Sequence, residues 1–519
     1  MVKLKFTLLL SIIITVCSYG QKEIYKSENP YKYSGYGNKE SLAISNPEKD
    51  EIVLLIEDSK STNLILLNET RKEIGNLKTD RLASNFKNFL GYNLYEDGSY
   101  AIIFSDTKHK KFGLLKFNFT ANSIEQKTLD FSYKKQKYVT SFTQNGNFYF
   151  MTALKGGSDD VNFFKFENND TFSNKTISFS FITTSVDGYK SRPIDLLTTR
   201  YLGNGSLTKI NPISPSSITT TSDPNKLYQI GNEVFITVDK SKNVTKVVRV
   251  NLEDFSIKTE SFEKPKLEPK EGQTAYFTKH NSFIHDGLIY QVKASSTEMK
   301  LTAKKLIDKE IVQELNVKKK DSITFKNGPI YQEKKSSSIF APESERQLEK
   351  TSKFLRKMSN ANAGITVDIV NEKMQLTIGG HIERKSSGGG FGVAGFAGGG
   401  LVGGLAVAGI SSGFNPTFTN YNSYSSSKTT YINCLFDNEF NHLQGDFKDN
   451  IFDRIKEYEE SFTKKQLSDG TYEYIFNPEV KIKLKNVFYH KDKHYIGYIN
   501  SKTKTYHLVE FSNELIKED

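Results

Sequence analysis

The feature that most constrains the fold is a pair of apolar β-hairpins that recurs along almost the whole chain. In each copy, an apolar strand, a tight polar turn and a second apolar strand are followed by a polar link and another hairpin. Turn pairs such as Asp97-Gly98 and Asn145-Gly146 tolerate the positive φ that a two-residue hairpin needs. Seven first hairpins can be counted, at residues 41–56, 91–104, 138–153, 226–238, 282–292, 365–378 and 483–499. The second hairpins are expected at residues 63–77, 113–131, 162–181, 247–262, 300–317, 430–447 and 505–516.

This arrangement resembles a β-propeller, in which each four-stranded unit is one blade. The first copies follow one another at about 48 residues, with no helix between their strands. We therefore predict an all-β fold, a β-propeller of about seven four-stranded blades that forms a single domain over residues 21–519. The resemblance extends over nearly all of the chain but names no family, because neither a WD dipeptide nor a kelch-type signature occurs. A row of independent β-sandwich domains is the alternative.

The N-terminus predicts export. Lys3 and Lys5 precede an apolar run and a small-residue site at Ser18-Tyr19-Gly20, which is typical of a signal peptide over residues 1–20. Soluble release is favoured over a lipoprotein attached at Cys17, and the expected location is the periplasm, the outer membrane or the outside of a bacterial cell. Cys434 then remains as the single cysteine and is expected in the core, so burial rather than a disulfide must stabilise the fold.

Four long insertions interrupt the repeat, and strand direction predicts that all four lie on one face of the ring. They are residues 182–225, residues 318–362 with a helix expected at 343–358, a glycine-rich apolar insertion at 382–428, and residues 448–482 with a helix expected at 450–462. Long insertions in a compact fold usually carry function. This decorated face is therefore the predicted working surface.

Arginine is concentrated in these connections. Seven of the nine arginines fall in links assigned to the decorated face, and arginine binds carboxylate and phosphate groups through a planar fork. We therefore predict an anionic or polar ligand, or an unidentified envelope protein, as the partner. The predicted ligand-binding residues are Tyr189, Arg192, Arg200 and Tyr201. Salt bridges within helices are an equally good explanation for several of the arginines.

The segment from Ser386 to Ser427 contains no charged residue, and residues 388–413 are rich in glycine and apolar side chains. Glycine content favours a flexible insertion. The apolar residues favour contact with a membrane or with the same segment of another copy, and the candidates are Phe391, Phe396, Leu401, Val402 and Leu405. A spanning helix is the third alternative, although a single crossing would separate two strands of one blade.

Motifs of known chemistry are absent from the sequence, so no catalytic residue, metal site or cofactor is assigned. His490 and His494 have a spacing that suits a metal, but they flank a turn and are expected to be solvated. The net charge of +11 comes mostly from scattered lysines, and nucleic acid is not an expected partner. A non-enzymatic binding or scaffold protein of the cell envelope is the first hypothesis. The others are a propeller hydrolase or lyase acting on a glycan or peptide, and a membrane-associated assembly factor.

Overall fold

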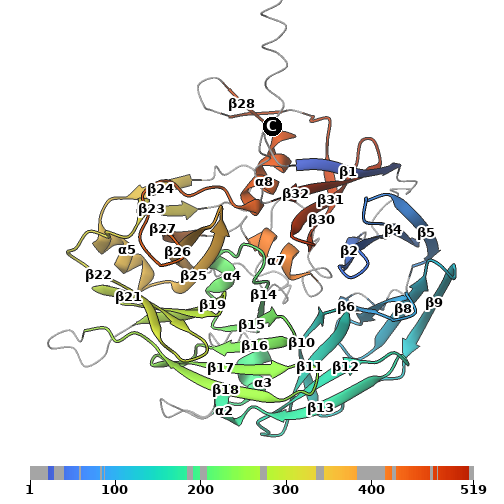
Figure 1. Cartoon of the computed structure of the whole chain (residues 1–519), viewed down its shortest axis with the longest axis horizontal. Helices are drawn as coiled ribbons and strands as arrows, with labels where there is room; N and C mark the ends of the chain where they lie inside the picture. Colours follow the sequence, from blue (N-terminus) through green and yellow to red (C-terminus); the bar gives the residue numbers. More distant parts are fainter. Residues whose placement is uncertain are drawn as a thin grey trace, which may run out of the picture.

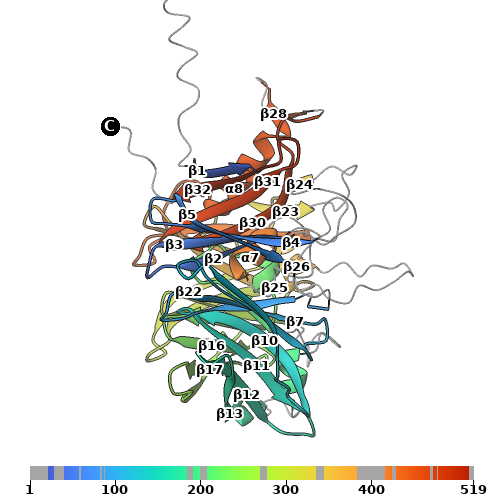
Figure 2. The same ribbon diagram turned by 90° about the vertical axis from the view of Figure 1, so that its right-hand side faces the viewer.

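The computed structural model describes residues 21–28, 40–57, 60–81, 85–86, 88–183, 191–198, 207–268, 278–334, 344–382, 415–423, 428–467, 472–475 and 477–512. Within them, seven sheets of four or five strands stand side by side in a closed ring, as a β-propeller (Figure 1). The side view in Figure 2 shows the strands crossing the thickness of the ring. The predicted seven-bladed fold is confirmed.

Five blades follow the predicted order, in which four consecutive strands run from the innermost to the outermost position. The first two consist of β2 (Glu40–Asn46), β3 (Glu51–Glu57), β4 (Ser61–Leu67) and β5 (Glu73–Asp80), and of β6 (Asn88–Leu94), β7 (Tyr100–Ser105), β8 (Phe112–Asn118) and β9 (Ser123–Leu129). The third consists of β10 (Gln136–Gln144), β11 (Asn147–Leu154), β12 (Asp160–Phe166) and β13 (Phe172–Ser178). The fourth consists of β15 (Asn225–Ile230), β16 (Glu233–Val238), β17 (Val244–Asn251) and β18 (Ile257–Glu263), and the fifth of β19 (Lys279–His285), β20 (Leu288–Ala294), β21 (Glu298–Lys305) and β22 (Ile311–Lys318).

The last two blades take an outer strand from earlier in the chain, so their predicted second hairpins are wrong. In the seventh blade, β30 (Ile482–His490), β31 (Lys493–Asn500) and β32 (Thr505–Ser512) are completed by β1 (Gln21–Glu28), which pairs antiparallel with β32 and closes the ring. In the sixth blade, β25 (Asn362–Val370), β26 (Lys373–Ile382) and β27 (Lys428–Phe436) are followed by β23 (Asn327–Lys334) and β24 (Ser344–Leu348). Both outer strands pair with residues far away in sequence, which a local hairpin pattern does not reveal.

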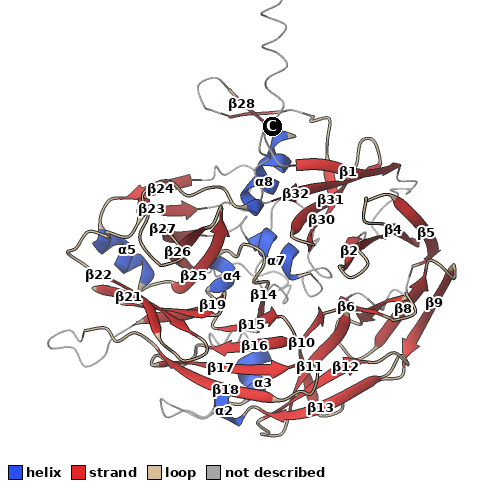
Figure 3. Ribbon diagram, in the orientation of Figure 1, coloured by secondary structure: helices blue, strands red, loops and turns tan. Residues whose placement is uncertain are grey.

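Helices are short and lie in the connections (Figure 3). They are α2 (Ser180–Thr183), α3 (Pro193–Thr198), α4 (Ile218–Thr221), α5 (Thr351–Met358), α7 (Pro416–Ser423) and α8 (Ile451–Ser461). The helix predicted at 450–462 is confirmed as α8, which starts at a capping box formed by Asn450 and Asp453. The helix predicted at 343–358 is half wrong, because residues 344–348 pair with β23 and only α5 is helical. Among the described residues, no helix is both long and apolar enough to cross a bilayer.

The connections sort onto two faces. Turns that join the first to the second strand, or the third to the fourth, form the turn face, at residues 47–50, 68–72, 95–99, 119–122, 145–146, 167–171, 231–232, 252–256, 286–287, 306–310, 371–372 and 491–492. Connections between second and third strands, or between blades, form the link face, with residues 60, 81, 106–111, 130–135, 155–159, 191–198, 239–243, 264–268, 295–297 and 501–504. Contacts respect this division. Arg71 reaches Asp50 on the turn face, at 2.9 Å, and the Lys155 amide donates to the Lys135 carbonyl on the link face.

The core lies between adjacent blades, because each sheet is buried on both sides. Cys434 has no exposed surface, so its predicted place in the core is confirmed, and burial raises the pKa of its thiol. An aromatic cluster fills the interface of the second and third blades, with Phe150 at its centre. The ring centroid of Phe150 lies 4.7 Å from that of Phe164 and 5.7 Å from that of Phe112.

Candidate functional site: a filled channel and a basic face

The central channel of the ring is occupied by the chain itself. Two segments lie inside the circle of innermost strands in Figure 1: residues 207–222, which include β14 (Thr208–Ile210) and α4, and residues 415–423, which include α7. β14 runs parallel to the innermost strand β15 and adds a fifth strand to the fourth blade, on its channel side. These segments belong to the insertions predicted at 182–225 and 382–428, and we call them together the channel plug.

Short polar side chains hold the two segments of the channel plug together. The Asn211 amide donates to the Thr417 hydroxyl at 2.8 Å, and the hydroxyls of Ser217 and Ser423 are 2.6 Å apart. Thr417 and Ser423 are almost fully buried. Buried polar groups are costly unless they are hydrogen-bonded, so these contacts define one arrangement of the two segments.

The channel plug is also tied to the wall of the ring. The Asn415 amide donates to Asn486 Oδ1 at 3.0 Å and to the Val487 carbonyl at 2.8 Å, both on β30. Helix α4 lies directly on β25, where a Cβ atom at Gly364 would come within 2.9 Å of the Ile218 carbonyl oxygen. The bare backbone of Gly364 is therefore what allows this close approach.

The insertion at 448–482 joins the channel plug through α8. The Tyr421 hydroxyl on α7 donates to Glu459 on α8 at 2.5 Å, and Lys485 on β30 pairs with the same carboxylate at 2.8 Å. The rings of Tyr421 and Phe452 meet edge to face. Three of the four long insertions therefore meet at the channel. The sequence pattern did not predict this contact.

His494 lies against the plug, and the expectation that it and His490 are solvated is wrong. His494 is 2% exposed, and its Nε2 lies 2.9 Å from the Ser214 hydroxyl. Burial lowers the pKa of His494 to about 3. Its partner Ser214 is 280 positions away in the sequence, which is why the local pattern suggested a turn.

His490 connects the seventh and first blades through two neighbours. Its Nδ1 lies 2.8 Å from the Ser45 hydroxyl, and its Nε2 lies 2.9 Å from Asp50 Oδ1. Burial lowers the pKa of His490, while Asp50 opposes that change. Asp50 also pairs with Arg71 at 2.9 Å and Lys491 at 3.1 Å. The order serine, histidine, aspartate matches the nucleophile, base and orienting acid of many hydrolases, but the His490 side chain has no exposed surface.

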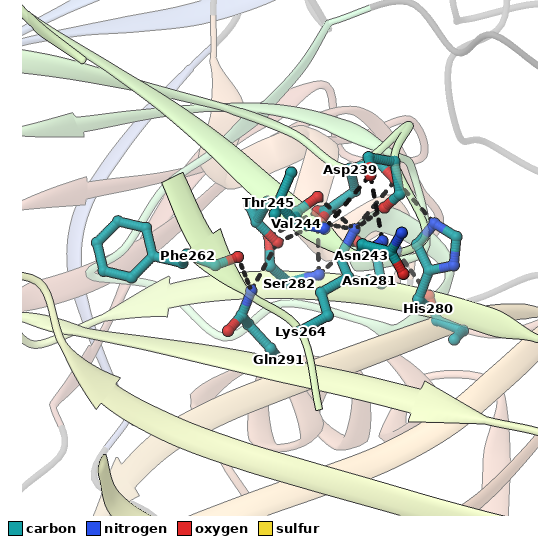
Figure 4. Close-up of polar contacts among 12 residues, drawn as sticks. Asp239, Asn243, Val244, Thr245, Phe262, Lys264, His280, Asn281, Ser282 and Gln291 are labelled. Carbon is teal, nitrogen blue, oxygen red and sulfur yellow. Dashed lines mark hydrogen bonds and ion pairs between the residues drawn. The ribbon is translucent and has the colours of Figure 1, made fainter. Parts of the chain in front are cut away.

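A buried charge cluster joins the fourth and fifth blades (Figure 4). Asp239 lies 3.0 Å from the Lys264 ammonium and 3.6 Å from that of Lys226, and all three side chains are fully buried. The hydroxyls of Ser282 and Thr245 donate to the same carboxylate at 2.6 and 2.7 Å. Burial alone would raise the pKa of Asp239, but Lys264 and Lys226 hold it well below its usual range. Every charge has partners within the cluster, so we interpret it as an interblade contact.

The two faces of the ring carry opposite charge. In the short connections listed above, which leave out those at residues 319–326, 349–361 and 437–481, the turn face has fourteen acidic and five basic residues. The link face has fifteen basic and six acidic residues, of which Lys264 and Asp239 are buried. Because charges of one sign on a broad face sum to a long-range potential, the molecule has a basic side and an acidic side. The described part of the insertion at 448–482 holds seven acidic and six basic residues, so it adds no positive charge to this side.

Of the predicted ligand-binding residues, only Arg192 lies in the described part of the chain. It is exposed and forms a two-pronged ion pair with Asp195 on α3, at 2.7 and 3.2 Å. Its guanidinium is therefore already engaged by a carboxylate of its own chain. Tyr189, Arg200 and Tyr201 lie outside the described residues, as do Phe391, Phe396, Leu401, Val402 and Leu405. In the described ranges, no group of three metal-binding side chains converges.

Acid should destabilise this protein through its buried histidines. Burial lowers the pKa of His494 to about 3 and that of His280 to about 4, so the folded state binds fewer protons than the unfolded state at mildly acidic pH. Stability is then complete above about pH 6.5 and falls as the pH drops towards these folded-state values. When the pH is lowered from 6.5 to 5, the free energy of unfolding of the wild type should fall by about 2 kcal/mol more than that of His494→Gln. Denaturant titrations at each pH measure this, and equal losses in both proteins would contradict it.

Comparison with known proteins does not name a family. No protein-family model and no curated protein sequence matches the chain. Among solved structures, the β-propeller domain of Nup133 from Vanderwaltozyma polyspora aligns with a TM-score of 0.35 and 8% identity, over 96% of this chain and 99% of that one. Polysaccharide lyase Uly1 aligns with a TM-score of 0.31 and 8% identity, over 96% and 94%.

The WD40 domain of SCAP from fission yeast aligns with a TM-score of 0.26 and 10% identity, over 95% of this chain and 89% of that one. Some of the other matches span only part of larger proteins. The chain covers 58% of an ACO/RPE65 chimera, 64% of the dehydrogenase NirN and 52% of prolyl oligopeptidase B from Galerina marginata. At these TM-scores the likenesses say nothing about function, and the assignment to β-propellers rests on the ring of sheets itself.

Proposed function

We propose that this chain is a non-enzymatic binding protein of the bacterial cell envelope, and that it meets its partner through the link face. The observation that carries the proposal is the filled channel. Propeller enzymes commonly act over the central channel, and here that space is taken up by the hydrogen-bonded channel plug. The outer surface of the ring is then what a partner can reach. The link face is favoured because its short connections carry an excess of basic residues.

Site-specific photo-crosslinking in the native host tests this assignment. A photoreactive residue in place of Thr107 or Thr503 samples the link face, and one in place of Glu96 or Glu253 samples the turn face; all four positions are exposed. We expect adducts with envelope components from the two link-face positions and none from the turn face. Adducts from the turn face alone would overturn the proposal.

A hydrolase is the second candidate, because of the Ser45, His490 and Asp50 arrangement. Its hydrogen bonds of 2.8 and 2.9 Å are those of a nucleophile with its base and of a base with its orienting acid. The full burial of His490 places this candidate second. A fluorophosphonate probe distinguishes the two, because it would label Ser45 in a hydrolase and leave Ser45→Ala unlabelled. We expect no label at Ser45 in the wild-type protein.

A further inference from the structure

The link face of the second and third blades carries a patch of exposed lysines that we call the lysine patch. Its members come from three neighbouring connections and are Lys108, Lys110, Lys111, Lys134, Lys135 and Lys155. Within the described part of the chain, none of these six ammonium groups forms an ion pair. This distinguishes them from Lys116 and Lys127, which are both paired with Asp170 near the turn face.

The three connections are held firmly against one another. The Lys155 amide donates to the Lys135 carbonyl at 2.9 Å, and the Tyr133 hydroxyl donates to the His109 carbonyl. The rings of His109 and Tyr138 stack with their centroids 3.9 Å apart. The backbone that carries the lysines is therefore held in place before a ligand binds. A ligand would not have to order these three connections, which lowers the entropic cost of binding.

Three acidic residues share the connections of the six lysines, so the patch keeps an excess of three positive charges. Asp106 turns its carboxylate back to its own loop, where it accepts from the amides of Lys110 at 2.6 Å and Lys111 at 3.1 Å. Asp130 and Asp159 lie in the neighbouring connections. Lys240 and Lys242 in the next blade extend the positive charge along the same face.

We propose that the ring docks flat on an anionic lipid bilayer, with the lysine patch against the headgroups and the acidic turn face pointing away. This proposal rests on the proposed function of the link face and names its partner. Lysines attract lipid phosphates as point charges, and each lysine near an anionic leaflet strengthens binding about five-fold. An anionic membrane repels the acidic turn face, so the link face is the side of the ring that turns towards the membrane.

Vesicle co-sedimentation of the mature chain tests the proposal. The vesicles are phosphatidylcholine alone, or phosphatidylcholine with phosphatidylglycerol, each at low and high salt. We expect binding only to the vesicles that contain phosphatidylglycerol, and weaker binding at high salt because the contact is largely electrostatic. The triple variant K108Q/K110Q/K111Q should lose about a hundred-fold in partition coefficient.

The matched control is K49Q/K72Q/K373Q, which removes the same charge from exposed positions at the turn face and should bind within about two-fold of the wild type. Equal losses in both triples would show a net-charge effect and overturn the proposal. Binding of soluble polyphosphate that depends on the lysine patch, without binding to vesicles, would also overturn it in favour of a free anion. If the protein did not bind vesicles but still formed crosslinks from the link face, only the lipid partner would be refuted. If it formed neither, the proposed function would be refuted as well.

Discussion

Replacing Asp239 by alanine should lower the free energy of unfolding by about 3–5 kcal/mol. The carboxylate is fully buried between Lys264 and Lys226, so its removal leaves two ammonium groups in the interior without their counterion. Ser282 and Thr245 would also lose the acceptor to which they donate. Chemical denaturation of the purified protein gives the value directly.

The contact between Glu310 and Lys305 supplies the control for this variant. It is an ion pair of 2.5 Å on the exposed turn face, so Glu310→Ala should leave the unfolding midpoint nearly unchanged. Asp239→Asn keeps the shape of the side chain but not its charge, and should come close to the alanine variant. A small loss in both Asp239 variants would contradict the account of this cluster as an essential interblade contact.

Phe150→Ala should cost about 3–5 kcal/mol, for a different reason. Phe150 has no exposed surface and lies in the aromatic cluster that joins the second and third blades. Truncation removes its apolar surface from the core and leaves a cavity among rings that are fixed by their own neighbours, Phe112 and Phe164. Phe150→Leu fills part of the cavity and should lose less.

Tyr474→Ala is the matched control for an aromatic truncation, because Tyr474 is 74% exposed. We expect a change within about 0.5 kcal/mol for this variant. If Phe150→Ala were as mild as Tyr474→Ala, the second and third blades would not share the core that is described above.

The regular part of the fold was predictable because its signals are local. Gly98, Asn145 and Gly146 adopt the positive φ that their hairpin turns were expected to require. Alternating apolar residues between such turns were enough to place the first hairpin of every blade. The outer strands β1 and β23 were missed, because each pairs with a strand that the sequence supplies much later.

The channel plug could not be predicted, because its contacts are polar and non-local. Residues rich in serine, threonine and asparagine look like a solvated loop until their partners are known, and Ser217 and Ser423 are 206 positions apart. The same holds for His490, which is separated from Ser45 by 445 positions. Charge on the link face, in contrast, follows from sequence once strand direction assigns each connection to a face.

The double variant S217C/S423C tests the filled channel most directly. The two hydroxyl oxygens are 2.6 Å apart, so two sulfur atoms at these positions should be able to form a disulfide, and the buried Cys434 should not compete for them. We expect mild oxidation of the folded protein to yield a single intramolecular disulfide, seen by intact mass and by a shift in gel mobility, while each single variant yields none. If both thiols stayed free in a correctly folded double variant under the same conditions, the two insertions would not meet in the channel, and the assignment of binding to the outer face would lose its basis.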